Sequence, residues 1–503
     1  MTTIRLALDV GTTAIKAAAF DPQGKIVAED SAPSTVIRGP NGENEQDPEI
    51  VWDAVATCLQ RTAGQVDPAR IKSLGICAQG DGFWPLDAGH KPVRPAILWS
   101  DTREDIAKDL AELSGGPATS AVGRGCNTAL WPGTSAMGWR WLRRNEPKAA
   151  ERVQYVATCG DFIGHRLTGV LSTDFANATI PFLDIASRSY GNAISALECT
   201  DLQDKLLPPK RAHAVLGHVT RAAARATGLP DGLPVSVATL DLGAMIVGLG
   251  MSRAGETMMI LGTTAVVNIL TDQIESTDDP IAATVLHPTN EVAIRVLAPS
   301  TGAAAFDWFA SLHPLSLGGE GTDEIAMKLN ALVEQVPIGA NGVTFLPYLN
   351  GERAPFVDPT VRAGFLGMSG STTKGELGRA VMEGTALSLR HCFEEENGLP
   401  TLPVNLTGGG ARNPVWCQII ADIIGQDVMV NSASDLGLWG AACIGAAAVS
   451  GEDPIALAAR NTDDLVTYRA DPNRHDTYAP VFKKYRKLSE ALRGASASEE
   501  SPT

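Results

Sequence analysis

The N-terminal segment alternates short apolar runs with turn residues. Residues 4–10, 15–20 and 25–29 are apolar or alternate apolar with polar positions, and Gly11-Thr12-Thr13 and Asp21-Pro22-Gln23-Gly24 separate them. Runs of this length that are interrupted by Gly, Pro and Asp predict strands joined by tight turns. We therefore expect the chain to open with a β-meander.

A helix is predicted directly after this meander. Asp47 is a suitable N-cap, and Pro48 fits the first position of a helix that extends to Leu59. Residues 71–78 and 235–240 form further apolar runs with the length of strands. Strands that lead through turns into helices indicate an α/β fold.

An internal repeat indicates that the chain consists of two similar halves. Gly11-Thr12-Thr13-Ala14 recurs as Gly262-Thr263-Thr264-Ala265, displaced by 251 residues, and each copy lies between two apolar strands. The displacement is half the length of the chain, which favours duplication over a chance match. A Pro/Gly cluster at 229–234 marks the boundary. We predict an N-terminal lobe over residues 1–233, a C-terminal lobe over 234–490 and a flexible tail over 491–503.

Composition narrows the class of protein. The 503 residues carry 41 Lys and Arg against 57 Asp and Glu, a net charge of −16, while 44% of residues are hydrophobic. This acidic balance argues against nucleic acid or a membrane surface as partner. The eight cysteines contain no CxxC pair, and the N-terminus lacks the apolar core of a signal peptide. We expect a cytoplasmic protein, and a homodimer is compatible with the sequence.

Both glycine–threonine turns are candidate phosphate sites, because backbone amides and hydroxyls of such turns converge on anions. The predicted contacts are Gly11, Thr12 and Thr13 in the first copy and Gly262, Thr263 and Thr264 in the second. Asp9 precedes the first turn, where the second copy has Ile260. A carboxylate beside bound phosphates suits Mg²⁺, which takes one or two carboxylates plus phosphate oxygens. Lys16 either adds positive charge to this site or faces solvent.

A third glycine loop precedes a well-marked helix. Gly408-Gly409-Gly410-Ala411-Arg412 follows a strand at 403–406, Asn413 is a suitable N-cap, and Pro414 and Gly425 mark the two ends of the helix. A structural turn rarely needs three glycines. We therefore favour contact with a nucleotide through Gly409, Gly410, Ala411 and Asn413 over a purely structural turn.

Asp241 follows the apolar run 235–240 at the predicted lobe junction. Carboxylates in such positions often only cap the next helix. A carboxylate beside bound phosphates can also take the proton of an attacking hydroxyl, which makes Asp241 a candidate general base.

Polar and aromatic residues at 79–84 and beyond resemble a carbohydrate site in composition. Amides and carboxylates bind sugar hydroxyls, and aromatic rings cover C–H surfaces. The tryptophans Trp99 and Trp131 are equally compatible with the core. The candidate substrate contacts are Gln79, Gly80, Asp81, Trp84, Asp101, Arg103 and Trp131.

Taken together, these segments resemble the FGGY type of carbohydrate kinase, within the sugar-kinase/Hsp70/actin superfamily. The resemblance extends from about residue 4 to about residue 490. It rests on Asp9–Thr13, Pro95–Arg103, Asp161 with Arg166–Gly169, Gly351–Pro355, Ala363–Met368 with 376–383, and Gly408–Asn413. It implies two ribonuclease H-like lobes around a central cleft that binds ATP, Mg²⁺ and a sugar or polyol. By position, Asp241 corresponds to the general base of the family.

The resemblance leaves the acceptor open. Where D-xylulose kinases carry Met-His after the equivalent of Gln79, this chain has Gly80-Asp81. Gln79-Gly80-Asp81-Gly82 is more similar to erythritol kinases, and the region of Leu130-Trp131 to L-xylulose kinases. The resulting hypothesis is an ATP-dependent kinase of a pentulose of the xylulose or L-xylulose type, with erythritol or another small polyol as the alternative. An actin- or Hsp70-like nucleotide switch without a sugar substrate is the alternative from another class.

Overall fold

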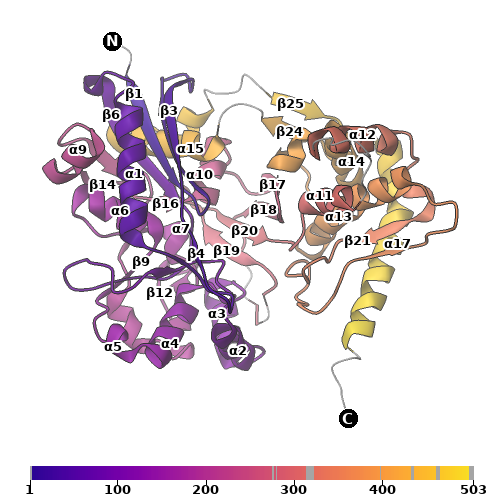
Figure 1. Ribbon diagram of the computed structural model, residues 1–503, viewed down its shortest axis with the longest axis horizontal. Coiled ribbons are helices and arrows are strands. Elements are labelled where there is room, and N and C mark those ends of the chain that lie inside the picture. The colour runs from indigo at the N-terminus through magenta and orange to yellow at the C-terminus, as the bar shows by residue number, and fades with distance from the viewer. Residues whose placement is uncertain are drawn as a thin grey trace. The chain divides into compact units, whose positions relative to one another are not determined.

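The computed structural model describes residues 3–274, 277–278, 280–312, 322–396, 398–431, 435–459 and 465–497. The chain forms two compact units (Figure 1). Unit 1 comprises Met1–Arg253, Thr271–Ile294 and Ala433–Asp463, and unit 2 comprises Ala254–Leu270, Arg295–Ser432 and Asp464–Thr503. The units are therefore interleaved in sequence, whereas the predicted lobes meet once, between residues 233 and 234. Of the predicted C-terminal lobe, the described residues of 234–253, 271–294 and 435–459 belong to unit 1.

Unit 1 is built on a mixed sheet in the order β14-β15-β6-β1-β2-β3. The predicted meander is present as three antiparallel strands. β6 lies parallel to β1. β16 continues β15 after a short break in the strand, and it also pairs with β6 in parallel. The strand bounds are β1 Ile4–Val10, β2 Ala14–Phe20, β3 Ile26–Pro33, β6 Ile71–Ala78, β14 Val215–His218, β15 Pro234–Ser236 and β16 Thr239–Leu240.

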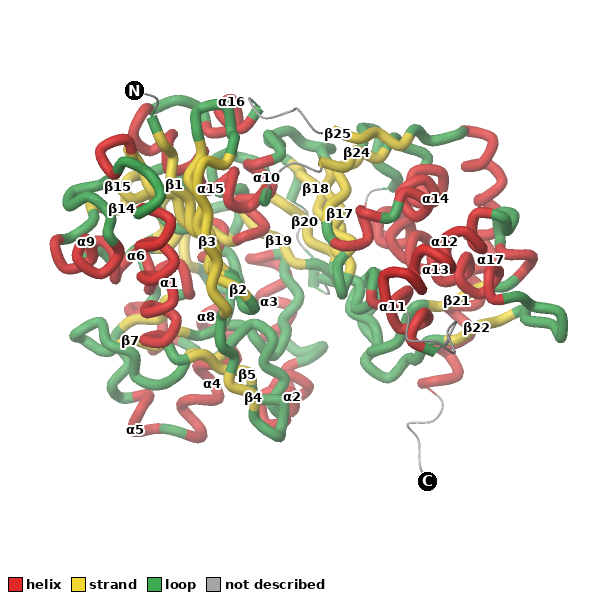
Figure 2. Tube along the Cα trace, turned by 45° about the horizontal axis from the view of Figure 1, so that its top comes forward, coloured by secondary structure: helices red, strands yellow, loops and turns green. Residues whose placement is uncertain are grey.

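Helices cover both faces of this sheet (Figure 2). Leu6, Leu8 and Val10 of β1 are buried in the same cluster as residues of α1 (Pro48–Ala63) and α6 (Cys159–Thr168). Ala7 points the opposite way and packs with α15 (Leu436–Ser450), as the alternation of side chains along a strand requires. α10 (Asp241–Gly248) packs closely on α15. Asp9 is two residues from Ala7 along β1, so its side chain lies on the same face of the sheet, the face that carries α15.

Smaller elements extend unit 1 beyond the sheet. β5 pairs with β4 and β8, and β7 pairs with β9. Their bounds are β4 Ile37–Arg38, β5 Asn44–Gln46, β7 Trp84–Leu86, β8 Ala96–Ile97, β9 Tyr155–Ala157, α2 Glu104–Leu113, α3 Pro117–Cys126, α4 Ser135–Asn145, α7 Phe175–Ala178 and α9 Arg221–Thr227.

Unit 2 repeats the core arrangement of unit 1. β17 is antiparallel to β18 and parallel to β23, which in turn is parallel to β24, and β25 is antiparallel to β24. β1 has the same relation to β2 and β6. The strand bounds are β17 Thr257–Leu261, β18 Ala265–Thr271, β23 Val404–Thr407, β24 Val428–Asn431 and β25 Leu465–Tyr468. The shared strand order supports the internal repeat that the sequence indicates.

Long helices make up most of the remainder of unit 2. α13 is buried over most of its length and packs against α11, α12 and α14. The bounds are α11 Ala304–Ser311, α12 Thr322–Glu334, α13 Lys374–Glu396, α14 Pro414–Ile424 and α17 Pro472–Ala497, with a hairpin of β21 Thr344–Leu346 and β22 Gly364–Leu366. Together with unit 1, this arrangement confirms the predicted α/β class.

Two local predictions differ from the structure. The predicted strand 235–240 is interrupted at Val237-Ala238, so that only its last two residues, in β16, pair with the end of β6. The predicted tail begins inside α17, which continues to Ala497, and residues 498–503 lie outside the described part of the chain. Among the described helices, none has the length and apolar character needed to cross a membrane.

Candidate active site

Three neighbouring strands of unit 1 end in one row. Val10 of β1 pairs with Ala78 of β6, and Leu240 of β16 pairs with the same Ala78. Because these strands are parallel, the chain leaves all three at the same edge of the sheet. Gly11, Gln79 and Asp241 are the residues that follow. In α/β sheets the carboxyl ends of strands are the usual place for ligand sites.

Carboxylates gather at this edge. Asp9 lies one residue before the row, and burial together with the negative charges of Asp241 and Asp435 raises its pKa to about 7. Lys16 opposes this shift, and its Nζ lies 2.6 Å from Oδ2 of Asp435. Oδ1 of Asp9 is buried and has no hydrogen-bond partner. The edge is thus short of positive charge.

Asp241 is the first residue of α10. Its Oδ1 accepts a hydrogen bond of 2.6 Å from the amide of Leu242, and part of its side chain is accessible. Desolvation by the surrounding protein raises the pKa of Asp241 above its ordinary value, while the Leu242 amide lowers it. An accessible carboxylate with a raised pKa is suited to accepting a proton.

The first glycine–threonine turn closes with a backbone bond of 3.0 Å from the amide of Gly11 to the carbonyl of Ala14. The Thr12 hydroxyl donates to Oε1 of Gln79 over 2.8 Å and accepts from Nε1 of Trp99 over 3.0 Å. Thr13 is exposed, and its carbonyl accepts from the amide of Ser34. The turn is therefore tied to the segments that the sequence assigns to the sugar.

Asp81 lies in the loop that follows Gln79. Its φ of 56° is in the left-handed region, and the adjacent Gly80 is held against Leu240, since a Cβ there would lie 2.6 Å from that side chain. Desolvation raises the pKa of Asp81 well above its ordinary value. Leu240 immediately precedes Asp241, so packing of Gly80 brings the loop next to the candidate base.

Asp81 lines a cavity of about 30 Å³, which has room for a water molecule. Asp161 and Asn177 line the same cavity; they are 2% and 8% exposed, and each has an Oδ1 atom without a hydrogen-bond partner. Burial raises the pKa of Asp161 to about 7. Unpaired buried oxygens require a donor, so this cavity fits a water or a ligand hydroxyl.

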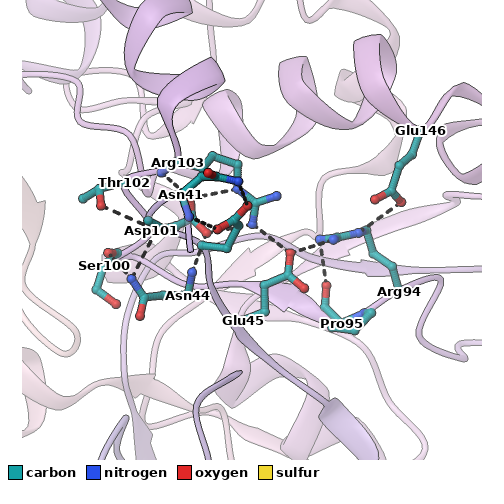
Figure 3. Close-up of polar contacts among 12 residues, drawn as sticks. Asn41, Asn44, Glu45, Arg94, Pro95, Ser100, Asp101, Thr102, Arg103 and Glu146 are labelled. Atoms are coloured by element: carbon teal, nitrogen blue, oxygen red, sulfur yellow. Dashed lines mark hydrogen bonds and ion pairs between the residues drawn. The ribbon is translucent and has the colours of Figure 1, made fainter. Parts of the chain in front are cut away.

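Asp101 and Arg103 form a buried ion-pair network rather than an open site (Figure 3). Arg103 donates from Nε and Nη2 to the two oxygens of Asp101, over 2.9 and 2.7 Å, and from Nη2 to Glu45 over 2.7 Å. Asp101 is fully buried and also accepts from the amide of Asn44, and Arg94 pairs with the same Glu45. Both predicted substrate residues are satisfied within the protein, where they hold the β5–β8 region together.

The tryptophans of this region have different environments. Trp84 is 1% exposed and packs on Phe162 with ring centroids 5.9 Å apart, so the structure places it in the core instead of at a sugar. Trp99 is 42% exposed. Trp131 is partly buried in the loop before α4. Of these three tryptophans, Trp99 and Trp131 are not fully buried.

The second glycine–threonine turn lies in unit 2. The amide of Gly262 donates to the carbonyl of Thr264 over 3.0 Å, which makes this turn one residue tighter than the first. Gly302 packs directly on the turn, with its amide bonded to the carbonyl of Thr263, and a Cβ at Gly302 would overlap the carbonyl of Thr264. Thr263 and Thr264 are exposed.

The triple-glycine loop packs against the same turn. Gly408 has a φ of 95°, and a Cβ there would lie 2.7 Å from the carbonyl of Leu261, whereas Gly410 is in close contact with the Leu261 side chain. Gly409 faces open space. Asn413 caps α14 as predicted, accepting from the amides of Val415 and Trp416, and its Nδ2 donates to Asn330. Two of the three glycines are thus explained by packing alone.

Comparison with known proteins identifies the family. The model for the N-terminal domain of the FGGY family of carbohydrate kinases matches residues 4–248, and the model for its C-terminal domain matches residues 257–449. The chain belongs to the FGGY family of carbohydrate kinases. It is thus an ATP-dependent carbohydrate kinase, and the family match decides against the nucleotide-switch alternative.

Relatives of this FGGY kinase cover nearly the whole chain. A xylulose kinase of Streptomyces rubiginosus is 32% identical, covering 90% of each chain. An erythritol kinase of Brucella abortus (strain 2308) is 27% identical over 97% of this chain and 96% of its own. The crystal structure of xylulose kinase from Rhodospirillum rubrum has a TM-score of 0.87 at 25% identity, covering 98% of this chain and all of that chain.

Within this FGGY kinase the predicted site residues fall into two groups. Unit 1 brings together Asp9, the first turn, Lys16, the loop 79–82 and Asp241, and unit 2 brings together the second turn and the triple-glycine loop. Sequence reasoning did not single out Asp435 or Asn177, and it named Asp161 only as a landmark of the family resemblance. Asp435 is 419 residues from Lys16, and no local pattern links them.

Proposed function

We propose that this kinase transfers the γ-phosphoryl group of ATP to a terminal hydroxyl of a pentulose of the xylulose or L-xylulose type. The observation that carries the proposal is the common row of strand ends, which brings Asp241, the first phosphate turn and the loop 79–82 to one edge of the sheet. The xylulose kinases among the relatives support this acceptor class.

In the proposed mechanism Asp241 accepts the proton of the attacking hydroxyl. Its raised pKa makes the carboxylate a stronger base than an ordinary aspartate. The hydrogen bond from Leu242 keeps the carboxylate oriented. Asp81 binds acceptor hydroxyls from the neighbouring loop, and the exposed face of Trp99 covers the carbon skeleton.

The phosphate side of the proposal rests on the two turns and Asp9. On unit 1 the amides of Thr12 and Thr13 and the ammonium of Lys16 bind phosphate oxygens, while the second turn and Gly409 remain the candidate nucleotide contacts on unit 2. The unpartnered Oδ1 of Asp9, with Asp241 and Asp435 nearby, fits Mg²⁺, which would neutralise phosphate charge. The described residues include no cluster of three metal-binding side chains, and Mg²⁺ takes one or two carboxylates together with phosphates.

Erythritol or another small polyol is the second candidate acceptor. Asp81 stands in the loop that contacts the acceptor, and an erythritol kinase is among the relatives. A carboxylate and an imidazole bind different sets of hydroxyls. We also propose a cytoplasmic location, which the eight free thiols support, and leave a homodimer as a proposal for the assembly.

A coupled kinase assay over D- and L-xylulose, D- and L-ribulose, erythritol, threitol, xylitol and glycerol tests the acceptor. We expect a pentulose to give the highest kcat/KM. Asp241→Asn should lower kcat by about 10³-fold or more while nucleotide still binds, since transfer without a base loses the proton acceptor. Near-normal turnover of Asp241→Asn would refute the assignment, and Asp53→Asn, at an exposed position of α1, serves as the matched carboxylate-to-amide control.

A further inference from the structure

The cavity that Asp81 lines in unit 1 is larger than one water molecule needs. Its volume is about 30 Å³, roughly two to three times the 10–15 Å³ that a single water requires. Apolar side chains line part of it, among them Ala178 and Phe182, and polar side chains line the rest. Two bonded heavy atoms, such as the carbon and oxygen of a hydroxymethyl group, therefore fit.

The side-chain amide of Asn177 points its oxygen away from Asp174. The backbone amide and Nδ2 of Asn177 each donate to Oδ1 of Asp174 over 2.8 Å. Burial raises the pKa of Asp174 to about 6, so above that pH the group is a carboxylate, which can only accept. Reversal of the amide would therefore place two acceptors against each other. Oδ1 of Asn177 is buried without a hydrogen-bond partner, 3.8 Å from the position of a Cβ at Gly80.

Asp161 contributes a second unpartnered oxygen. Its Oδ2 accepts from the amide of Thr158 over 2.9 Å, in the capping box at the start of α6. Its Oδ1 is buried and has no hydrogen-bond partner. The Thr173 hydroxyl also faces this carboxyl and favours its charged form, but it forms no hydrogen bond to Oδ1. Two oxygens that line one cavity thus lack a donor, which is rare for buried polar groups.

The cavity and the candidate base adjoin the same loop. Gly80 packs on Leu240, since a Cβ there would lie 2.6 Å from that side chain, and Asp241 follows Leu240 directly. Asp81 follows Gly80 and lines the cavity. α7, the helix of Asn177, packs against β16, the strand that ends at Leu240. An acceptor with one hydroxyl at Asp241 and another at Asp81 therefore extends toward the cavity.

The chemistry of the lining limits what can bind. None of the described residues that line the cavity is Lys, Arg or His, and two of them are aspartates, which disfavours an anion. A carbonyl oxygen has no proton to give to the unpartnered oxygens. Burial raises the pKa of Asp161 to about 7, so its protonated form is available near neutral pH. A hydroxyl can then accept from Asp161 and donate to Oδ1 of Asn177, which satisfies both buried oxygens.

We propose that this cavity is a subsite for the terminal hydroxymethyl group of the acceptor, at the end opposite the hydroxyl that is phosphorylated, with Asp161 and Asn177 as its hydrogen-bond partners. The inference rests on the proposed function, because it takes Asp241 and Asp81 as the other contacts of the acceptor. The methylene carbon packs against the apolar lining at Ala178. Asp161 and Asn177 thereby select acceptors that end in a primary alcohol over those that end in a methyl group.

The first test compares an acceptor with the analogue that lacks the hydroxyl at this end, such as xylulose with 1-deoxyxylulose. The discrimination factor is the ratio of their kcat/KM values at saturating ATP. Asp161→Ala removes one partner of the hydroxyl. Asp161→Asn is the conservative variant, because its amide nitrogen can donate as the protonated carboxyl does. Asp53→Ala, at an exposed position of α1, is the matched control.

We expect a discrimination factor of about tenfold or more in the wild type, Asp161→Asn and Asp53→Ala, since the deoxy analogue leaves buried oxygens unpaired. Asp161→Ala should bring the factor to within about threefold of one. Each ratio is taken within one protein, so a general loss of stability does not change it. A factor near one in the wild type, or an unchanged factor in Asp161→Ala, would overturn the inference.

A second test fills the cavity without changing its polarity. Ala178→Val adds two methyl groups to the lining, whereas Ala176→Val makes the same change at a buried position of α7 that does not line the cavity. Ala178→Val should raise KM for the acceptor by about tenfold or more and leave KM for ATP within about twofold. Ala176→Val should leave both within about twofold. Equal effects of the two variants would show that the acceptor does not enter the cavity.

The same measurements separate the subsite from the proposed function. Phosphorylation of xylulose without discrimination against 1-deoxyxylulose would reject the subsite and keep the proposed function. Phosphorylation of erythritol but of no pentulose, with strong discrimination against the deoxy analogue of erythritol, would reject the pentulose proposal and keep the subsite. If no acceptor of the panel is phosphorylated, both are rejected.

Discussion

The two glycine–threonine turns share a sequence and a strand order but differ in their surroundings. In unit 1 the turn follows Asp9, and the Thr12 hydroxyl is bonded to Gln79 and Trp99. In unit 2 Ile260 occupies the position of Asp9, and the turn is held by Gly302 and the triple-glycine loop through backbone contacts. The side chains of Thr263 and Thr264 are exposed.

The difference shows how one motif can serve two purposes. The second turn is held by backbone contacts, and it has no carboxylate at the position that corresponds to Asp9. The first turn combines amides with a buried carboxylate, a lysine and a hydrogen bond to Gln79. The duplicated turn therefore keeps its Gly-Thr-Thr sequence and its place between two strands, although the second copy is one residue tighter, and the neighbouring residues of the two copies differ.

Of the predicted changes, replacement of Asp9 should have the largest effect on kcat. Asp9→Asn should lower kcat by about 10²–10³-fold, the size of effect seen when one group that stabilises transition-state charge is removed. Ile260 is at the matching position before the second turn. A conservative change there, Ile260→Val, should leave kcat within about twofold of the wild type. Steady-state kinetics with saturating ATP and acceptor measure both. Equal effects of the two variants would show that the turns are not functionally distinct.

Packing around the second turn gives the next largest effect. Gly302→Ala should lower the free energy of unfolding by about 1–3 kcal/mol, since its Cβ would overlap the Thr264 carbonyl. Gly409→Ala should leave stability within about 0.5 kcal/mol, because its Cβ would face open space. Urea unfolding compares the two. If Gly409→Ala destabilises as much as Gly302→Ala, packing does not explain the second turn.

The last expected effect concerns the pH dependence of stability in unit 1. The pKa of Asp161 is raised by burial to about 7 from an ordinary value of 3.8, so the folded state holds its proton more tightly than the unfolded state. Its contribution to stability is present below about pH 4 and is lost as pH rises through about 7, by up to about 1.4 kcal/mol per pH unit. Asp161→Asn should remove this part of the slope.

Unfolding free energies of the wild type and Asp161→Asn, measured by urea titration from pH 4.5 to 7.5, check this prediction. As pH rises, the free energy of unfolding of Asp161→Asn should increase relative to that of the wild type. Arg103 pairs with Asp101 elsewhere in unit 1, and Asp101→Asn serves as a variant that breaks a buried pair instead. A difference between wild type and Asp161→Asn that stays constant across this range would contradict the raised pKa.

Much of the fold is predictable from local patterns. β1 and β6 begin and end at the predicted residues, and α14 has the predicted cap and both predicted ends. These features depend on side-chain alternation, Asn and Pro at a helix start and Gly at its end, which act within a few residues. The predicted strand 235–240 is split into β15 and β16, which both pair with β6 but in registers that differ by one residue.

Site residues are harder to predict, because aromatic and charged residues serve in the core as well as at ligands. Trp84 and Trp99 each follow an apolar residue, yet Trp84 starts β7 and packs on α6, whereas Trp99 lies in the loop after β8 and is 42% exposed. Asp101 and Arg103 follow Trp99 closely in the sequence. They form an ion pair with each other, and Arg103 also pairs with Glu45. Their roles depend on which partners the fold brings within reach.

The sequence alone determined the α/β class, the repeated turns, the candidate base and the family resemblance, since each follows from local patterns or from motifs at characteristic spacing. Only the tertiary structure decided that Asp435 pairs with Lys16, that Asp81, Asp161 and Asn177 share one cavity, and that Thr12 is bonded to Gln79 and Trp99. The physical reason is that hydrogen bonds and ion pairs act over a few ångströms. Residues far apart in the sequence meet at those distances only after strands and helices have packed.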